Sequence, residues 1–131
     1  MTENQKKSAK ILLVEDDGFI LNIYETKLKD AGYVVYTATN GKEAIATLEG
    51  KTADIILLDI VMPYMDGFDV LERLQANEEW KKIPVVLLTN LSQKEDVEKG
   101  ISLGARDYLI KSHFTPSEVL GKIEGLLQKQ S

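Results

Sequence analysis

The chain has 131 residues, 44% of them hydrophobic, which is the length of one ordinary domain with enough apolar side chains for a core. It has a formal net charge of −5 and no cysteine. The acidic balance argues against nonspecific nucleic-acid binding, and the missing cysteines exclude disulfides and zinc–thiolate sites. No apolar run approaches the roughly 20 residues of a membrane span. We therefore expect a cytoplasmic protein that binds neither nucleic acid nor a membrane directly.

The first half of the chain alternates strands with helices. Residues 1–9 are polar and predict a disordered N-terminal arm, and the pattern of a single folded domain runs from 10 to 129. Strands are expected over 10–14, 33–37 and 54–58, and helices over 17–30 and 41–48. The run over 54–58 lacks polar alternation, so we place this strand at the centre of the sheet. The more polar strand over 33–37 is expected at an edge.

The second half continues the alternation and carries signals at its helix starts. We expect a helix over 67–75, a charged connection over 77–82, a strand over 83–88, a helix over 92–103, a strand over 107–110 and a last helix from 115. Asp66 is expected to cap the first of these helices. Ser92 with Glu95, and Thr115 with Glu118, form capping-box signatures for the other two. Five strand–helix units with short links predict a parallel sheet covered by helices on both faces.

Polar side chains follow four of the predicted strands at the point where each strand ends. They are Glu15, Asp16 and Asp17 after the first strand, Asp59 after the third, Thr89 after the fourth and Lys111 after the fifth. In a parallel sheet these ends share one edge, where open α/β sheets bind ligands. Carboxylates gathered there repel one another unless a cation or proton intervenes, and Mg²⁺ accepts oxygen ligands while leaving positions for phosphate. Metal ligands, a nucleophile, a hydroxyl and a fixed cation are what phosphoryl transfer needs.

Four motifs carry a resemblance to a known family, namely ILLVEDD, IILLDIVMPYMDG, VVLLTN and GARDYLIK. In this order and spacing, over about residues 10–129, the chain resembles the receiver domain of bacterial two-component response regulators, and in particular its stand-alone, chemotaxis-regulator-like members. The resemblance implies a flavodoxin-like (βα)5 fold, a doubly wound five-stranded parallel sheet with strand order 2-1-3-4-5.

The resemblance also implies roles for the acidic residues. Asp59 is the phosphoacceptor, whose carboxylate attacks phosphorus and becomes an acyl phosphate. Asp16 and Asp59 ligate Mg²⁺ together with the backbone carbonyl of Val61, and Glu15 helps directly or through water. An ionised carboxylate is a usable nucleophile at neutral pH, and a divalent cation offsets its repulsion of an incoming phosphate.

Three further residues receive roles from the same resemblance. Lys111 contacts one phosphoryl oxygen, and the hydroxyl of Thr89 bonds another and moves toward the phosphate. Tyr108 occupies the aromatic switch position and reorients as Thr89 moves. The added negative charge then biases a surface made by the fourth helix, fifth strand and fifth helix.

The chain departs from the family pattern beside these residues. Ser112 follows Lys111 where the family usually has proline, often after a cis peptide bond; a non-proline cis bond costs about 2.5–4 kcal/mol. Either the bond is trans and Lys111 approaches differently, or the fold holds a strained cis bond. Val61 and Leu91 are apolar at positions that influence dephosphorylation in the family. Neither can orient a water molecule, so we predict a long-lived phosphorylated state.

Two residues have plainer interpretations. Asp17 is expected mainly to cap the helix that follows it. His113 is the single histidine and has no second histidine or cysteine near it in the sequence. We expect it to be a surface or capping residue rather than a metal ligand or phosphodonor.

The resulting prediction is a phosphorylation-activated switch rather than a turnover enzyme. Its expected partners are a histidine kinase or phosphotransfer protein and a downstream protein target or tethered output domain, with a homodimer and a stand-alone or excised receiver left open. A degenerate receiver scaffold is the alternative, against which Asp59, Asp16, Lys111 and Thr89 argue. A flavin carrier would need a phosphate-binding loop where Glu15, Asp16 and Asp17 stand. A haloacid-dehalogenase-like phosphatase would need an Asp-x-Asp pair and a cap insertion that the sequence lacks.

Overall fold

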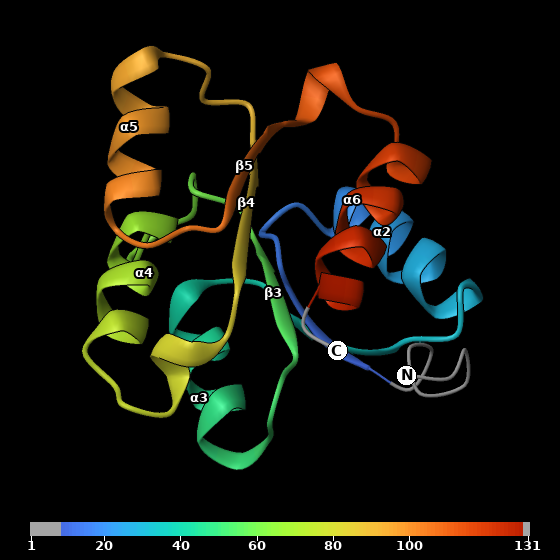
Figure 1. Ribbon diagram of the computed structural model, residues 1–131, viewed down its shortest axis with the longest axis horizontal. Coiled ribbons are helices and arrows are strands. Elements are labelled where there is room, and N and C mark those ends of the chain that lie inside the picture. The colour runs from blue at the N-terminus through green and yellow to red at the C-terminus, as the bar shows by residue number, and fades with distance from the viewer. Residues whose placement is uncertain (1–8, 130–131) are drawn as a thin grey trace.

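Five parallel strands form one sheet in the order β2-β1-β3-β4-β5 in the computed structural model, which describes residues 9–129 (Figure 1). The elements are β1 (Lys10–Val14), α2 (Gly18–Asp30), β2 (Val34–Ala38), α3 (Gly41–Gly50), β3 (Ile55–Leu58), α4 (Gly67–Gln75), η1 (Trp80–Lys82), β4 (Val85–Thr89), α5 (Lys94–Ser102), β5 (Asp107–Ile110), η2 (Lys111–His113) and α6 (Pro116–Lys129). This order confirms the predicted doubly wound fold.

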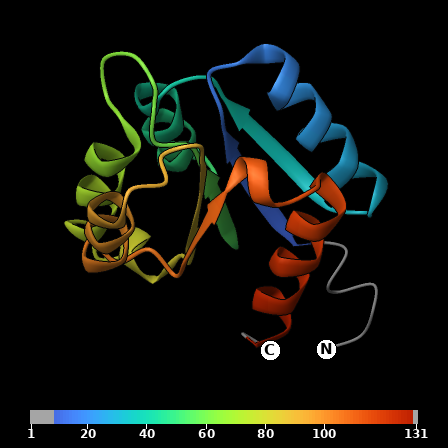
Figure 2. The ribbon, with the colours of Figure 1, turned by 90° about the horizontal axis from the view of Figure 1, so that it is seen from above.

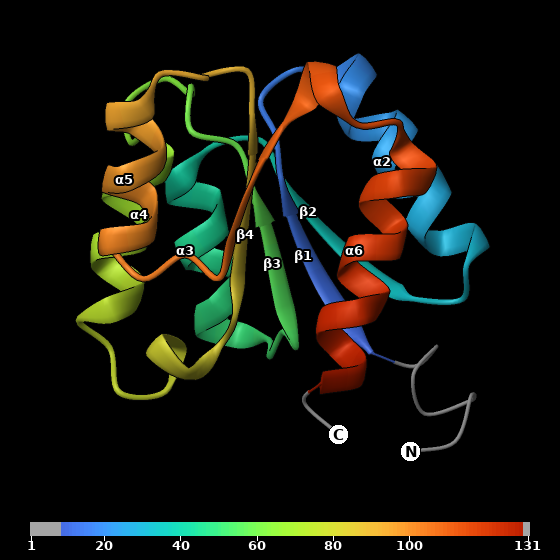
Figure 3. The same ribbon diagram turned by 45° about the horizontal axis from the view of Figure 1, so that its top comes forward.

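Helices cover both faces of the sheet. Figures 2 and 3 show α2 and α6 on one face and α3, α4 and α5 on the other. Because successive strand residues point to opposite faces, Leu12 and Val14 enter the core beneath α3 and α4, whereas Ile11 and Leu13 enter the core beneath α2 and α6. Every residue of β3 is buried. This explains its continuous apolar run and confirms its expected central place.

Several predicted helix starts are confirmed by their hydrogen bonds. Asp17 caps α2 by accepting hydrogen bonds from two amides of its first turn, and Asn40 caps α3. Asp66 and Asp69 form a reciprocal capping box at α4. At α6, the amide of Thr115 donates to Glu118 and the amide of Glu118 donates to the hydroxyl of Thr115.

The predicted capping box of Ser92 and Glu95 is wrong. The helix begins later, with Gln93 as its N-cap, and no side-chain cap hydrogen bond forms at this end within the part of the chain that the structure describes. Ser92 precedes the N-cap by one residue, so its hydroxyl is displaced from the amides of the first turn. Helix α5 therefore starts without the side-chain capping hydrogen bonds that its sequence predicted.

Other boundaries differ by small amounts. β2 runs one residue later than expected, over Val34–Ala38, and lies at the sheet edge as predicted. β4 begins at Val85, because Trp80–Lys82 forms a short 3-10 helix and the following residues connect it to the strand. No peptide bond among the described residues is cis, so the bond from Lys111 to Ser112 is trans. Most of the predicted arm over 1–9 lies outside the described residues.

Candidate functional site

The carboxyl ends of β1 and β3 bring three acidic side chains together. The two strands pair in register, and the amide of Asp59 donates to the carbonyl of Val14 at 3.0 Å. One carboxylate oxygen from each of Glu15, Asp16 and Asp59 lies within 4.8 Å of the other two. Glu15 and Asp59 are buried, with exposed fractions of 3% and 6%, whereas Asp16 is open to solvent. The cluster therefore has a closed inner side and an open outer side.

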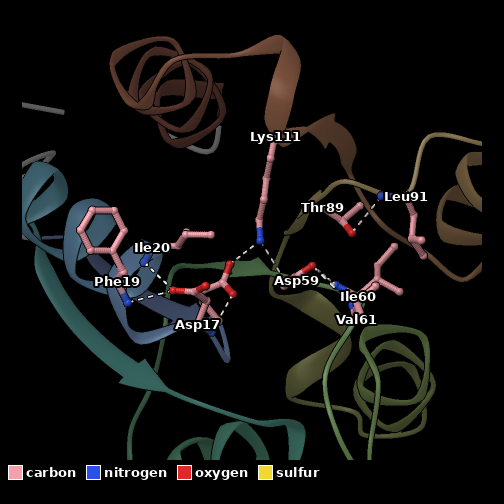
Figure 4. Close-up of polar contacts among 10 residues, drawn as sticks. Asp17, Phe19, Ile20, Asp59, Ile60, Val61, Thr89, Leu91 and Lys111 are labelled. Atoms are coloured by element: carbon pink, nitrogen blue, oxygen red, sulfur yellow. Dashed lines mark hydrogen bonds and ion pairs between the residues drawn. The ribbon is translucent and has the colours of Figure 1, made fainter.

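Lys111 is the cation that faces this cluster. It follows β5, and its Nζ lies 2.5 Å from Oε1 of Glu15 and 2.9 Å from Oδ2 of Asp59 (Figure 4). Its side chain is 13% exposed. The trans bond to Ser112 thus does not prevent Lys111 from reaching the carboxylates. Three carboxylates against one ammonium leave the site with excess negative charge.

Burial and hydrogen bonding have opposite effects on the pKa of each group in the ion pair of Glu15 and Lys111. Burial raises the pKa of Glu15 above its usual value, although hydrogen bonds from Lys111 and the amide of Asp17 pull it down. Burial alone would lower the pKa of Lys111, but its hydrogen bonds to Glu15 and Asp59 outweigh that effect and raise it. Lys111 therefore stays charged at neutral pH, and the cost of burying the carboxylate of Glu15 is only partly offset.

Backbone amides donate hydrogen bonds that orient the carboxylates of Asp59 and Glu15. Oδ1 of Asp59 accepts the amide of Ile60 at 2.7 Å and, more weakly, the amide of Val61 at 3.4 Å. Oε2 of Glu15 accepts the amide of Asp17 at 3.0 Å. The carboxylate of Asp17 itself is used by α2, so this acid caps a helix as expected and does not join the cluster.

A second group of polar contacts lies at the end of β4. The side chain of Thr89 is fully buried, and its Oγ1 accepts the amide of Leu91 at 3.3 Å. The hydroxyl of Tyr108 donates to the carbonyl of Leu91 at 2.7 Å. Burial, with smaller contributions from the charges of Asp96 and Asp59, raises the pKa of Tyr108 to about 12. The loop after β4 is thus bonded both to Thr89 and to Tyr108.

Apolar side chains border the site. Val61 follows Asp59 by two residues and is 58% exposed, and Leu91 is half-buried. Figure 4 shows Val61 beside Asp59 and Leu91 beside Thr89. His113 is exposed in η2, as expected for a surface residue.

Sequence reasoning missed two contributors to this geometry. A side chain on Gly67 would place its Cβ 2.5 Å from the carbonyl oxygen of Asp59, so only glycine allows α4 to begin directly beneath the acidic residue. The Asp-Gly pair at the start of α4 was the available signal. The carbonyl of Leu91 is the acceptor for Tyr108, and an apolar residue in a loop gives no sequence signal for such a backbone role.

Comparison with known proteins identifies the family. The model of the response regulator receiver domain matches residues 11–124. The chain belongs to this family. Receiver domains are signalling switches rather than turnover enzymes, they interact with histidine kinases, and they bind Mg²⁺ at an acidic pocket. In this chain, Glu15, Asp16 and Asp59 form an acidic cluster.

Full-length relatives are named as transcriptional regulators. The chain is 37% identical over 127 residues to the probable transcriptional regulator ycf27 of Pyropia yezoensis, a match covering 97% of this chain and 50% of that protein. It is 34% identical over 120 residues to the alkaline phosphatase synthesis transcriptional regulatory protein PhoP of Bacillus subtilis, covering 92% and 49%. The chain thus spans about half the length of the curated relatives it matches.

Solved receiver structures share the fold. The chemotaxis protein CheY4 of Vibrio cholerae superposes with a TM-score of 0.84 at 33% identity, covering 89% of this chain and 97% of that one. The receiver domain of the Francisella response regulator 1452 gives 0.87 at 30% identity, covering 95% and 100%. Among residues 9–129, no helix is long and apolar enough to cross a membrane.

Proposed function

We propose that this receiver domain, formed by residues 10–129, accepts a phosphoryl group on Asp59 from a histidine kinase or phosphotransfer protein. The observation that carries the proposal is the buried carboxylate of Asp59, which is clustered with two other carboxylates and contacts the ammonium of Lys111. The phosphorylated domain then changes its α5-β5-α6 surface and its affinity for a downstream protein or a tethered output domain. Transcriptional regulation, named for the full-length relatives, is the proposed context.

The donor set fits Mg²⁺. Carboxylate oxygens are the hard ligands that this ion prefers, and the excess negative charge of the cluster needs a divalent neutraliser. Asp16 and Asp59 would hold the ion with the backbone carbonyl of Val61, and Glu15 would assist directly or through water. When bound, Mg²⁺ supplies positive charge that offsets the repulsion between the carboxylates and a phosphoryl group.

The chain's own groups account for the transfer. An oxygen of Asp59 forms a bond to phosphorus while the bond from phosphorus to the donor's imidazole nitrogen breaks, and that nitrogen leaves with the electron pair. The amide of Ile60 holds the carboxylate in position. Lys111, already 2.9 Å from Asp59, supplies a fixed positive charge for a phosphoryl oxygen.

Transmission begins at Thr89. Its hydroxyl can donate to a phosphoryl oxygen, which would move it away from the amide of Leu91. The same loop residue accepts the hydroxyl of Tyr108 through its carbonyl. A shift of Thr89 therefore reaches Tyr108 and the start of α5 through two backbone contacts of Leu91.

Phosphorylation with a small acyl phosphate donor and Mg²⁺, followed by intact mass spectrometry, tests the proposal. We expect the parent protein to gain one phosphoryl group and the Asp59→Asn variant to gain none. Asp66→Asn is the matched control, because asparagine can still cap α4 and residue 66 lies outside the cluster. A parent protein that binds Mg²⁺ but gains no phosphoryl group would instead favour a phosphorylation-independent scaffold.

The apolar border of the site implies slow loss of the phosphoryl group. Neither Val61 nor Leu91 offers a side-chain group that could orient an attacking water molecule. Val61→Asn should shorten the phosphorylated lifetime, measured as phosphate release from the isolated phosphoprotein. Rapid release from the parent, unchanged by this substitution, would contradict the proposed lifetime.

A further inference from the structure

Helix α5 contacts the sheet differently from its neighbours. Within α5, all of whose residues are described, Gly100 alone is buried. Helices α3 and α4 instead bury several apolar side chains, including Ile45 and Leu48 in α3 and Phe68 and Leu71 in α4. The backbone of α5 at Gly100 therefore lies directly against side chains of the sheet, without a side chain of its own between them.

The space beside Gly100 is already filled. A Cβ atom added there would lie 2.6 Å from Cδ1 of Leu87 and 3.1 and 3.3 Å from two ring carbons of Tyr108. Gly100 is not among the residues with a positive φ, so helical backbone geometry does not itself require glycine. Two neighbours therefore require glycine here. Cδ1 of Leu87 is the nearer and lies at the end of a flexible side chain that can move aside, whereas the Tyr108 ring is also held by the hydrogen bond from its hydroxyl to Leu91. By contrast, a Cβ on Gly121 of α6 would meet no described atom within 4 Å.

Tyr108 is thereby held at both ends. One side of its ring lies against the backbone of α5 at Gly100, and its hydroxyl donates to the carbonyl of Leu91 in the loop that leads into the same helix. The amide of Leu91 in turn donates to the hydroxyl of Thr89. The position of the ring and the hydrogen bonds of this loop are therefore linked.

We infer that Gly100 is a positioning residue of the switch, whose missing side chain admits the Tyr108 ring and so maintains the hydrogen bond from Tyr108 to Leu91. A methyl group at position 100 displaces the ring, weakens this hydrogen bond and loosens the loop between Thr89 and α5. The signalling consequence rests on the proposed function, in which Thr89 and Tyr108 move together. The packing relation itself does not depend on phosphorylation.

Nuclear magnetic resonance of the unphosphorylated protein tests the inference. The ring resonances of the 5 tyrosines can be labelled, and that of Tyr108 is identified by its absence in Tyr108→Phe. We expect Gly100→Ala to shift the Tyr108 ring and Leu91 amide resonances and to leave those of Tyr33, on the opposite face, unchanged. Gly100→Ala with both the Tyr108 and Leu91 resonances in their parent positions would overturn the inference.

Two further variants separate this effect from simple destabilisation. Gly121→Ala makes the same change in a helix where the space is open, so it should move neither resonance. Gly100→Ala combined with Leu87→Val removes the Cδ1 atom that makes the closest contact, and keeps the test available if the single variant does not fold. In that background the Tyr108 ring should still be displaced; a ring in its parent position would count against the inference.

Failure of the proposed function can be told apart from failure of this inference. If the parent protein takes no phosphoryl group on Asp59 while Gly100→Ala still moves Tyr108, the signalling proposal falls and the packing relation stands. If the parent is phosphorylated but the Tyr108 resonances do not change in Gly100→Ala, the packing relation is wrong and the proposed phosphorylation stands.

Discussion

Helices α4 and α5 lie on the same face of the sheet but are fixed to it by different means. α4 buries four apolar side chains in the core and begins with a two-sided capping box; these buried residues are Phe68, Val70, Leu71 and Leu74. α5 buries only Gly100 among its described residues and begins at Gln93 without a side-chain cap. The helix next to Asp59 is thus fixed by buried side chains, whereas the helix reached through Thr89 and Tyr108 buries a single glycine and contacts α4 through Lys99, whose Nζ lies 4.5 Å from the centroid of the Phe68 ring. In the proposed function, this difference would let a phosphoryl group on Asp59 leave α4 in place and move α5.

The largest expected effect contrasts a buried position in α4 with an exposed apolar position in α5. Leu71→Ala removes a side chain that is fully buried in α4, and we expect a loss of about 2–5 kcal/mol in the free energy of unfolding. Ile101→Ala in α5 changes a residue that is 48% exposed and should cost well under about 1 kcal/mol. Urea unfolding of both variants measures the contrast, and equal losses would show that α5 is anchored as firmly as α4.

The capping box of α4 provides the next prediction. Asp66→Ala removes the acceptor of the Asp69 amide, at 2.9 Å, and should cost about 1 kcal/mol. Asp66→Asn keeps an acceptor at this position and serves as the control, with a loss of at most a few tenths of that value. Thermal unfolding distinguishes them; identical losses for alanine and asparagine would argue that the charge rather than the cap matters.

The hydroxyl of Tyr108 makes the stability of the protein depend on pH. Tyr108→Phe should cost about 0.5–1.5 kcal/mol at neutral pH, because the hydrogen bond to Leu91 is lost. The folded-state pKa of about 12 lies above the ordinary value of 10.0, so this stabilisation is complete below pH 10.0 and is lost as pH rises toward 12.

The free energy of unfolding, measured between pH 10.0 and about pH 12, reports the loss of this stabilisation. The alkaline decline in stability should be shallower in Tyr108→Phe than in the parent. Tyr33, whose pKa is also raised to about 12 by burial and the charge and hydrogen bond of Glu124, provides a matched Tyr33→Phe variant on the opposite face. Parallel declines in the parent and Tyr108→Phe would exclude a linked hydroxyl at Tyr108.

The smallest expected effect is a gain in the stability of α5 rather than a loss. Gln93 has the extended backbone of an N-cap but contributes no side-chain cap within the described part of the chain. Gln93→Asp should therefore stabilise α5 by about 0.5–1 kcal/mol, since aspartate accepts amides of the first turn. Slower hydrogen exchange of the α5 amides would report the gain directly; unchanged exchange would mean that the start of α5 is not its weak point.

The sequence predicted the sheet because its signals are strong and local. The continuous apolar run of β3 is typical of a strand buried on both faces, and the polar residues after four of the strands indicated one functional edge. Thr115 and Glu118 lie three residues apart and form the predicted capping box, and Asp66 caps α4 as predicted. For the same reason, the acidic cluster could be anticipated before any distance was known.

The remaining features depend on contacts between residues distant in sequence. Ser92 and Glu95 have the spacing of a capping box, but the loop that holds Leu91 near Thr89 and Tyr108 delays the helix start. Gly100 resembles an ordinary surface glycine until Leu87 and Tyr108 are placed beside it. Tertiary packing decides both cases, and a local pattern contains no information about it.

Amide resonances of the parent protein, recorded with Mg²⁺ before and after phosphorylation by a small acyl phosphate donor, test whether α5 rather than α4 responds to the phosphoryl group. We expect large shifts around Asp59 and then along Thr89, Leu91, α5 and Tyr108, with the core side of α4 nearly unchanged. Asp59→Asn should show none of them under the same conditions. Shifts confined to the residues around Asp59, or spread equally over α4 and α5, would contradict the claim that the weakly held helix carries the signal.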